Sequence, residues 1–282
     1  MKKLLYFLLF FNFSFLNILG ANERIITLSP AINEIVFALG LGGKVVANTD
    51  FCDYPDISKS VQKVGGYGSV SLEKVVKLNP NVLINQSYDK KLNSDLEKLG
   101  FKTLVYKSDN IEDIKYTIKD LGDIFQKTQE AKRLNDEIDS SLKSLENIIK
   151  NQKILIVISP QNTLSNQIFV AGNFVYFEDV IKKSQNKNAY QSSIKSQPVI
   201  NSEKIITLNP DIIVLLAPFL ENDKITQEKY IKMWEKLPVS ASKEKNIYII
   251  DKLYSGIPSH RVKNFIDDFR GILEDVRAKK LQ

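Results

Sequence analysis

The chain has 282 residues, of which 43% are hydrophobic and 26% charged, so it can bury a sizeable core. This composition excludes a disordered chain, a collagen-like chain and a multi-span membrane protein. One cysteine, Cys52, and one histidine, His260, exclude a disulfide framework, a cysteine-based zinc site and every motif that needs two histidines. The net charge is +6, but acidic residues are interspersed among the basic residues along the chain. No stripe of basic residues with interleaved aromatic residues occurs, so we expect no nucleic-acid partner.

The N-terminal 21 residues have the pattern of a secretory signal. Residues 1–3 are a short cationic region, residues 4–19 are apolar, and Gly20 and Ala21 are the small residues expected at a cleavage site. The apolar run is shorter than the roughly 20 residues that a membrane-spanning helix needs. We therefore expect a cleaved signal peptide over residues 1–21 and a periplasmic mature protein, although the pattern leaves the exact cleavage position open.

Short apolar strands alternate with helical patterns through the first half, which predicts a parallel α/β sheet. Ser71 is positioned as a helix N-cap, and Gly40 and Gly100 follow the ends of two helices. The predicted elements are strand 25–28, helix 31–40, strand 44–48, a Pro- and Gly-rich loop to residue 70, helix 71–78, strand 82–85, helix 91–99 and strand 102–106.

The middle of the chain is helical, and strands return after it. Apolar residues keep helical spacing from Ile111 to Phe125, and a second helix is predicted from Thr128 to Asn151, long enough to be a rigid connector between two domains. The later elements are strand 153–158, helices 175–183 and 202–208, strand 211–216, helix 226–236, strand 247–250 and a closing helix over about 259–278. The predicted organisation is an N-terminal α/β lobe over 22–127, a connecting helix over 128–151 and a C-terminal α/β lobe over 152–282.

Two pairs of segments repeat at one common offset along the chain. IITLSP at 25–30 matches LIVISP at 155–160, and EKVVKLNPNVLI at 73–84 matches EKIITLNPDIIV at 203–214. The offset is too long for a solenoid, in which repeats have about 20–50 residues. The repeat therefore predicts two lobes of similar α/β topology.

The segments RIITLSPAINEIVFALGLGGKVVANTDFCDYP at 24–55 and VGGYGSVSLEKVVKLNPNVLI at 64–84 resemble a known family. They are similar to the periplasmic substrate-binding proteins that serve ABC importers of vitamin B12, haem and ferric siderophores, and most of all to the cobalamin-binding members. The resemblance covers the mature chain. It implies two similar α/β lobes joined by a single long helix, with a ligand cleft between them.

The resemblance also implies the function, namely capture of a metal-centred ligand outside the cytoplasm and its delivery to an ABC importer. Cobalamin is the first expectation, and haem, a ferric siderophore or another metal chelate is the alternative. The bound ligand would be a cobalt or iron complex, and no intrinsic cofactor is expected. The affinity, the extent of lobe closure and the state of Cys52 stay open.

Aromatic side chains on loops that follow predicted strands are the candidate ligand contacts, because aromatic faces stack on a flat macrocycle. Cobalamin-binding members often carry a Trp near Gln86, where this chain has Tyr88 instead. Arg261, which matches a family position that reaches the cleft, is a further candidate, and His260 could ligate the metal of a bound ligand. The predicted ligand contacts are Tyr54, Tyr67, Tyr88, Phe169, Tyr254, His260 and Arg261.

Glu73 and Glu203 occupy equivalent positions of the repeat. The resemblance implies that both dock into arginine pockets on the permease dimer, which works with a separate ATPase, and a monomeric carrier is expected. No G-x-S-x-G motif occurs, and the glycine-rich segment 40–44 lacks phosphate-loop spacing, so we expect no enzyme. A secreted enzyme or a metal chaperone on the same scaffold is the runner-up interpretation.

Overall fold

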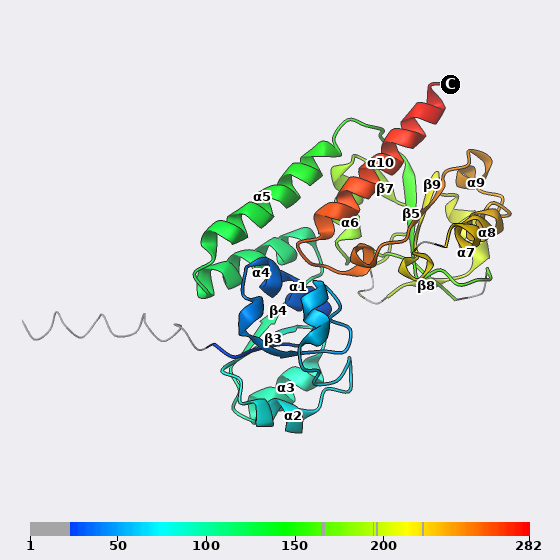
Figure 1. Ribbon diagram of the computed structural model, residues 1–282. Helices are drawn as coiled ribbons and strands as arrows, with labels where there is room; N and C mark the ends of the chain where they lie inside the picture. Colours follow the sequence, from blue (N-terminus) through cyan, green and yellow to red (C-terminus); the bar gives the residue numbers. More distant parts are fainter. Residues whose placement is uncertain (1–22, 165–166, 194, 196, 222) are drawn as a thin grey trace, which may run out of the picture. The chain divides into compact units, whose positions relative to one another are not determined.

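The computed structural model describes residues 23–282 except 165–166, 194, 196 and 222 (Figure 1). The predicted signal peptide therefore lies outside the described residues. The chain divides into two compact units. Unit 1 extends to Tyr106 and adds Leu121–Lys127, and unit 2 comprises Lys107–Asp120 and Thr128–Gln282.

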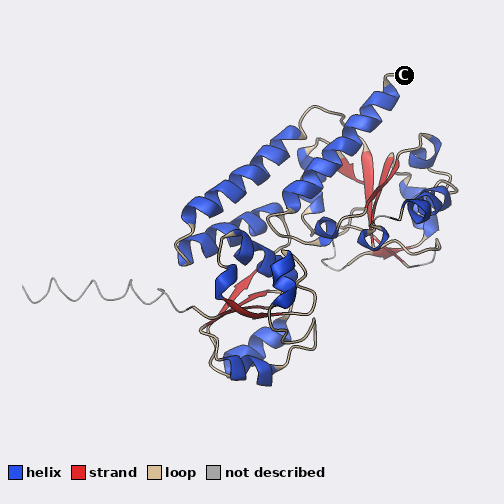
Figure 2. Cartoon of the chain, in the orientation of Figure 1, coloured by secondary structure: helices blue, strands red, loops and turns tan. Residues whose placement is uncertain are grey.

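Unit 1 is a parallel sheet with helices on both faces (Figure 2). The strand order is β2-β1-β3-β4, and every pairing is parallel. One face packs against α2 and α3 through a core that contains Ile26, Val75 and Leu96. The elements are β1 (Ile25–Thr27), α1 (Pro30–Ala38), η1 (Gly42–Lys44), β2 (Val45–Asn48), η2 (Asp56–Ser60), α2 (Leu72–Leu78), β3 (Val82–Gln86), α3 (Lys90–Lys98) and β4 (Thr103–Tyr106).

Unit 2 has the same sheet topology. Its strand order is β10-β9-β5-β7, in which β5 and β9 are the repeat partners of β1 and β3. A core around Trp234 packs on one face, and within the same unit the ring of Phe265 stacks on Phe269 and meets Phe177 edge-to-face. The elements are β5 (Lys153–Ile158), β6 (Ile168–Phe169), α6 (Phe177–Lys183), β7 (Lys187–Asn188), β8 (Val199–Ile200), α7 (Ser202–Leu208), β9 (Ile212–Leu216), η3 (Pro218–Leu220), α8 (Lys224–Trp234), α9 (Ser240–Lys243), β10 (Ile247–Ile250), η4 (Leu253–Gly256) and α10 (Val262–Lys280).

The prediction of an α/β chain with a repeated topology is thus confirmed, but the central helix is shorter than predicted. Two helices occupy this region, α4 (Ile111–Ile124) and α5 (Thr128–Ser144). Asn147 and Asn151 adopt left-handed φ angles of 64° and 62°, which an α-helix cannot contain. The helix therefore stops before Asn151. Its packing partners include α10 and α6 of unit 2.

A buried polar network holds the loop that follows β2 in unit 1. The side-chain amide of Asn48 donates to the backbone oxygen and the hydroxyl of Ser58 at 3.1 and 2.9 Å. The amide of Asn33 on α1 donates to the backbone oxygen of Tyr54 at 3.0 Å and to the Ser58 hydroxyl at 2.8 Å. The network thus fixes the loop against both the sheet and α1.

The ammonium group of Lys63 completes this network as a cation among oxygens. Its Nζ donates to Oδ1 of Asn48 at 2.8 Å and to the backbone oxygens of Thr49, Cys52 and Ser58 at 3.2, 3.2 and 3.3 Å. These four oxygens come from the end of β2 and from three positions along the loop that follows it, so a single positive charge holds the loop against the strand.

We expect Lys63→Ala to lower the unfolding free energy of the protein by about 2–4 kcal/mol, because several buried oxygens lose a charged donor. Urea unfolding measures this loss, and added ammonium or methylammonium should restore part of it by entering the vacated space. Lys59→Ala is the matched control, because Lys59 lies in the same loop with its side chain exposed. A Lys63→Ala loss no larger than that of Lys59→Ala, with no ammonium effect, would contradict the role of the Lys63 charge.

Candidate ligand-binding site

Exposed aromatic side chains follow the strand ends of unit 1. Tyr54 and Tyr67 lie in the loops after β2 and Tyr88 lies after β3, and 43%, 70% and 51% of their surfaces are exposed. Because β2 and β3 run parallel in one sheet, their carboxyl ends lie at one edge. The rings of Tyr67 and Tyr88 lie 5.5 Å apart between centroids, tilted by 55°. Burial in the loop, followed by the neighbouring Tyr67, raises the pKa of Tyr88 to about 12, so its phenol is neutral at physiological pH.

Glycine permits the tight loop that presents Tyr67. Gly65 has a φ of +113°, and a Cβ there would lie 2.3 Å from the backbone oxygen of Ser69. A Cβ on Gly66 would lie 3.1 Å from the ring of Phe51. Phe51 is itself 63% exposed and therefore joins the aromatic group, although the sequence analysis did not single it out. Its place beside the Cys52-Asp53-Tyr54-Pro55 segment was the available signal.

In unit 2, Tyr254 and Arg261 lie against each other. The guanidinium carbon of Arg261 is 5.7 Å from the ring centroid of Tyr254, a cation–π distance. The phenol of Tyr254 donates to Oδ2 of Asp268 at 2.6 Å. Burial and this hydrogen bond to a carboxylate raise the pKa of Tyr254. Arg261 is the N-cap residue of α10 and is buried, so its charge is held in place by its surroundings.

His260 precedes α10 in the same segment. Among the described residues no partner hydrogen-bonds to its buried Nδ1. Burial is the main reason that the pKa of His260 is lowered to about 4, and the positive charge of Arg261 adds to the effect. The imidazole of His260 is therefore neutral at physiological pH.

The remaining predicted residues lie on separate elements. Phe169 is the last residue of β6, which pairs with β8 in a two-stranded antiparallel ribbon, and the ring is partly exposed. Glu73 and Glu203 are exposed in the first turns of α2 and α7. The structure therefore brings Tyr67 together with Tyr88, and Tyr254 together with Arg261.

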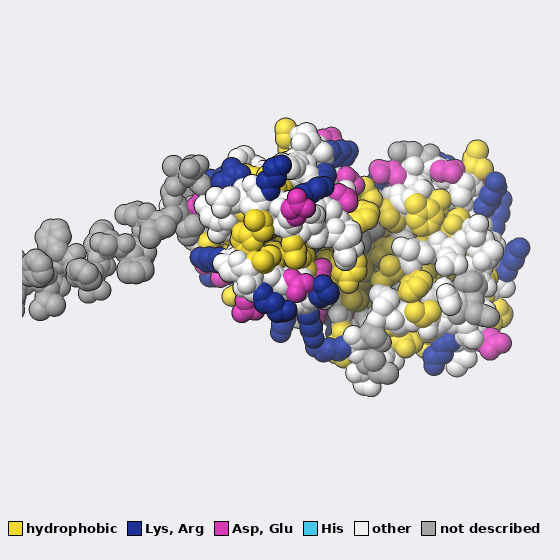
Figure 3. All heavy atoms as spheres, turned by 90° about the horizontal axis from the view of Figure 1, so that it is seen from below, with side chains coloured by type: hydrophobic (Ala, Val, Ile, Leu, Met, Phe, Trp, Pro, Cys, Tyr) yellow, Lys and Arg dark blue, Asp and Glu magenta, His cyan; other side chains and the backbone are white. Residues whose placement is uncertain are grey.

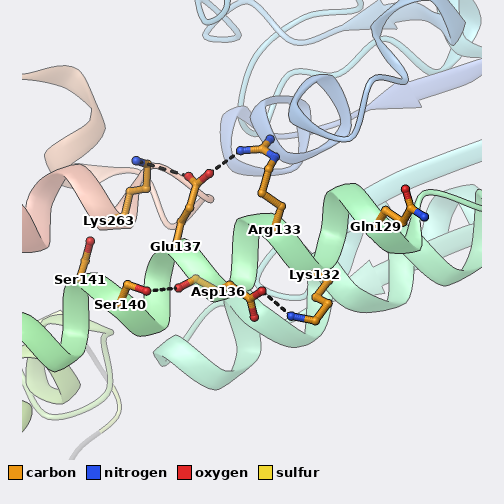
Figure 4. Close-up of a pocket in the computed structure, with 8 residues that line it drawn as sticks. All are labelled: Gln129, Lys132, Arg133, Asp136, Glu137, Ser140, Ser141 and Lys263. Atoms are coloured by element: carbon orange, nitrogen blue, oxygen red, sulfur yellow. Dashed lines mark hydrogen bonds and ion pairs between the residues drawn. The ribbon is translucent and has the colours of Figure 1, made fainter.

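A charged groove of about 510 Å³ lies along α5 and the start of α10, away from the aromatic loops in sequence (Figure 4). Glu137 accepts from Arg133 and lies 3.4 Å from Nζ of Lys263, and Lys132 pairs with Asp136. The charged side chains that line the groove are thus largely paired with one another. The groove offers ion pairs and no exposed ring, so it is a poorer fit for an apolar macrocycle than the aromatic loops.

Protein side chains alone do not form a metal centre in the part of the chain that the structure describes, since no three His, Cys, Asp or Glu residues are grouped as a metal site requires. None of its helices combines the length and apolar character needed to cross a membrane.

Comparison with known proteins gives a consistent result. Residues 25–254 match the family of periplasmic binding proteins. The vitamin B12-binding protein of Vibrio campbellii is 26% identical over 277 residues, which cover 97% of this chain and 96% of that protein.

Two solved structures from Vibrio cholerae have the same fold. The periplasmic vitamin B12-binding protein BtuF matches with a TM-score of 0.75 at 20% identity, over 90% of this chain and 98% of that chain. The periplasmic haem-binding protein HutB matches with a TM-score of 0.70 at 21% identity, over 90% and 99%. Since the family match extends over most of the chain, the chain belongs to the periplasmic binding proteins.

Proposed function

We propose that this protein is an extracytoplasmic carrier that binds a metal-centred macrocycle, with cobalamin as the first choice, and delivers it to an ABC importer. The aromatic group of Phe51, Tyr54, Tyr67 and Tyr88 carries the proposal. Solvent-exposed rings at the strand ends of an open α/β sheet are costly unless a ligand covers them. Their faces suit a large, flat and partly apolar ligand.

Three residues of unit 2 are further proposed ligand contacts. Phe169 and Tyr254 add aromatic surface, and Arg261 adds a fixed positive charge for amide, carboxylate or phosphate oxygens of the ligand. The vitamin B12-binding relatives support cobalamin as the first choice.

Haem is the second candidate, and His260 favours it. An imidazole that stays neutral at physiological pH can ligate iron through a ring nitrogen. The fold likeness to haem-binding HutB is compatible with either ligand. In both cases the bound ligand supplies the metal, cobalt or iron, and the protein needs no cofactor of its own.

The proposed partners are a permease dimer and its ATPase. Glu73 and Glu203 are exposed on repeated helices, one in each unit, and would pair with basic pockets on the two permease subunits. The carrier would act in the periplasm after removal of the predicted signal. Energy for release would come from the ATPase, and the carrier itself would catalyse no reaction.

Titration of the mature chain with cyanocobalamin, haemin and a ferric siderophore tests the proposal. Calorimetry and the absorbance of each ligand are the suitable signals, because Trp234 is buried in the core of unit 2 and need not sense the ligand. We expect one ligand per chain, and at least ten-fold weaker binding after Tyr67→Ala combined with Tyr88→Ala. Saturation with haemin that is lost in His260→Ala would replace cobalamin by haem. Binding of none of the three would contradict the proposal.

Glu73→Gln combined with Glu203→Gln should abolish uptake of the bound ligand by cells while ligand affinity stays unchanged, because both side chains lie outside the aromatic group. Lys74→Gln combined with Lys204→Gln is the matched control, since these lysines are exposed next to the glutamates. Uptake at the wild-type rate in the glutamate double variant would rule out docking through this pair.

The lowered pKa of His260 predicts a pH-dependent stability difference. Its pKa is about 4 in the folded protein against an ordinary 6.5, so the unfolded chain takes up the proton first as the pH falls. Stability from the neutral imidazole is therefore fully present above pH 6.5 and is lost between pH 6.5 and 4. Relative to His260→Gln, the wild type should lose about 1–3 kcal/mol over this range in urea unfolding. Parallel stability curves for the two proteins would show that His260 is not held neutral by the fold.

A further inference from the structure

The short helices α2 and α7 expose the same pair of side chains. Over residues 71–80 and 201–210 the order of buried and exposed side chains is identical, position by position. Three residues after each exposed glutamate stands an exposed aliphatic residue, Val76 in α2 and Ile206 in α7. Their exposed fractions are 51% and 39%. Residues three apart on a helix are surface neighbours, so each helix presents a carboxylate beside an aliphatic side chain.

Equivalent caps hold the two helices in equivalent settings. The side chains of Ser71 and Asn201 accept from the backbone N–H of Lys74 and Lys204 at 3.3 and 2.8 Å. At the other end, Asn79 and Asn209 take left-handed φ angles of 46° and 45°. Because both ends and the buried Val75 and Ile205 are fixed, the outward direction of residues 76 and 206 follows from the fold.

Neither Val76 nor Ile206 belongs to a hydrophobic core cluster described for its unit. A β-branched aliphatic residue is a modest helix former, and a polar residue would serve better at an exposed helix position. Figure 3 views the molecule from the side on which α2 and α3 lie in Figure 1, and hydrophobic side chains are exposed there among lysines and acidic residues. The two carboxylates have no ion-pair partner in the described part of the chain: lysines adjoin them in sequence, but neither Glu73 nor Glu203 lies within salt-bridge distance of a basic group.

A glutamate alone is a weak anchor at a protein surface, because water and salt screen an exposed ion pair. An aliphatic neighbour that packs into the partner excludes water from the contact and strengthens the pairing. Packing of each aliphatic residue against a docked partner would therefore strengthen the ion pair that its glutamate makes.

We propose that Val76 and Ile206 are the apolar halves of two equivalent docking contacts, each completed by its glutamate. The partner that fits is a pair of identical subunits, each of which presents a basic side chain beside an apolar hollow. This inference rests on the proposed function and identifies these subunits with the permease dimer. A second copy of this chain fits less well, because it would bring carboxylate against carboxylate at each contact.

The test is binding to the cognate permease–ATPase complex in lipid nanodiscs, with ligand titration of the same variants. Val76→Ser combined with Ile206→Ser should weaken binding to the complex at least ten-fold at low and at high salt, and leave ligand affinity unchanged. Val105→Ser combined with Ile225→Ser is the matched control, because it removes one exposed valine from unit 1 and one exposed isoleucine from unit 2. The control should bind the complex like the wild type.

The glutamate double variant separates the two claims. It should weaken binding mainly at low salt, where ion pairs are strongest. If it weakens binding and the serine double variant does not, the apolar contact is wrong and the proposed docking stands. If neither weakens binding, docking through these helices fails as a whole. Each single serine variant should also weaken binding, and a loss confined to one of them would overturn the equivalence of the two contacts.

Discussion

Parallel strand pairing is the constraint on which the molecule depends. In each unit the strands point the same way, so every loop that follows a strand emerges at one edge of the sheet. In unit 1 this edge collects Phe51 and Tyr67 from the segment after β2 and Tyr88 from the loop after β3. The proposed binding surface of unit 1 thus follows from the sheet topology, and its aromatic character comes from the residues that these loops carry.

The loops themselves need support, because rings exposed to water have no core to hold them. Lys63 provides it by drawing one side-chain oxygen and three backbone oxygens of the loop around its ammonium group. Gly65 supports the loop in a different way, because it allows a turn that any side chain at this position would block. A rigid aromatic surface loses less conformational entropy when a ligand binds, which favours affinity.

The repeated helices α2 and α7 are likewise held in place by a few specific contacts. Each is only seven residues long and gains its rigidity from its caps and from one buried aliphatic side chain. Such a helix can present a carboxylate and an aliphatic residue to a partner without moving. The proposed ligand contacts and the proposed docking contacts lie on separate segments, so that each set can be changed without the other.

Much of the fold could be predicted from the sequence, because its signals are local. Apolar runs before Ser-Pro or after Asn-Pro mark β1, β3, β5 and β9 closely, and the repeat at residues 73–84 and 203–214 predicted the common topology. Long-range features could not be read in this way. In the sequence Lys63 looks like any surface lysine, because its oxygen partners meet only when the loop folds around it. The helix predicted to reach Asn151 ends at Ser144, ahead of the left-handed Asn147. The roles of the predicted ligand contacts stay predictions, since a sequence places residues on loops but does not show what covers them.

Hydrogen–deuterium exchange of the mature chain, with and without the ligand that saturates it, tests the central claim most directly. We expect slower exchange in residues 49–55, 64–70 and 86–90 of unit 1, together with 253–261 of unit 2. Protection confined to residues 129–141, beside the charged groove of Figure 4, would contradict it, as would binding without protection of the aromatic loops.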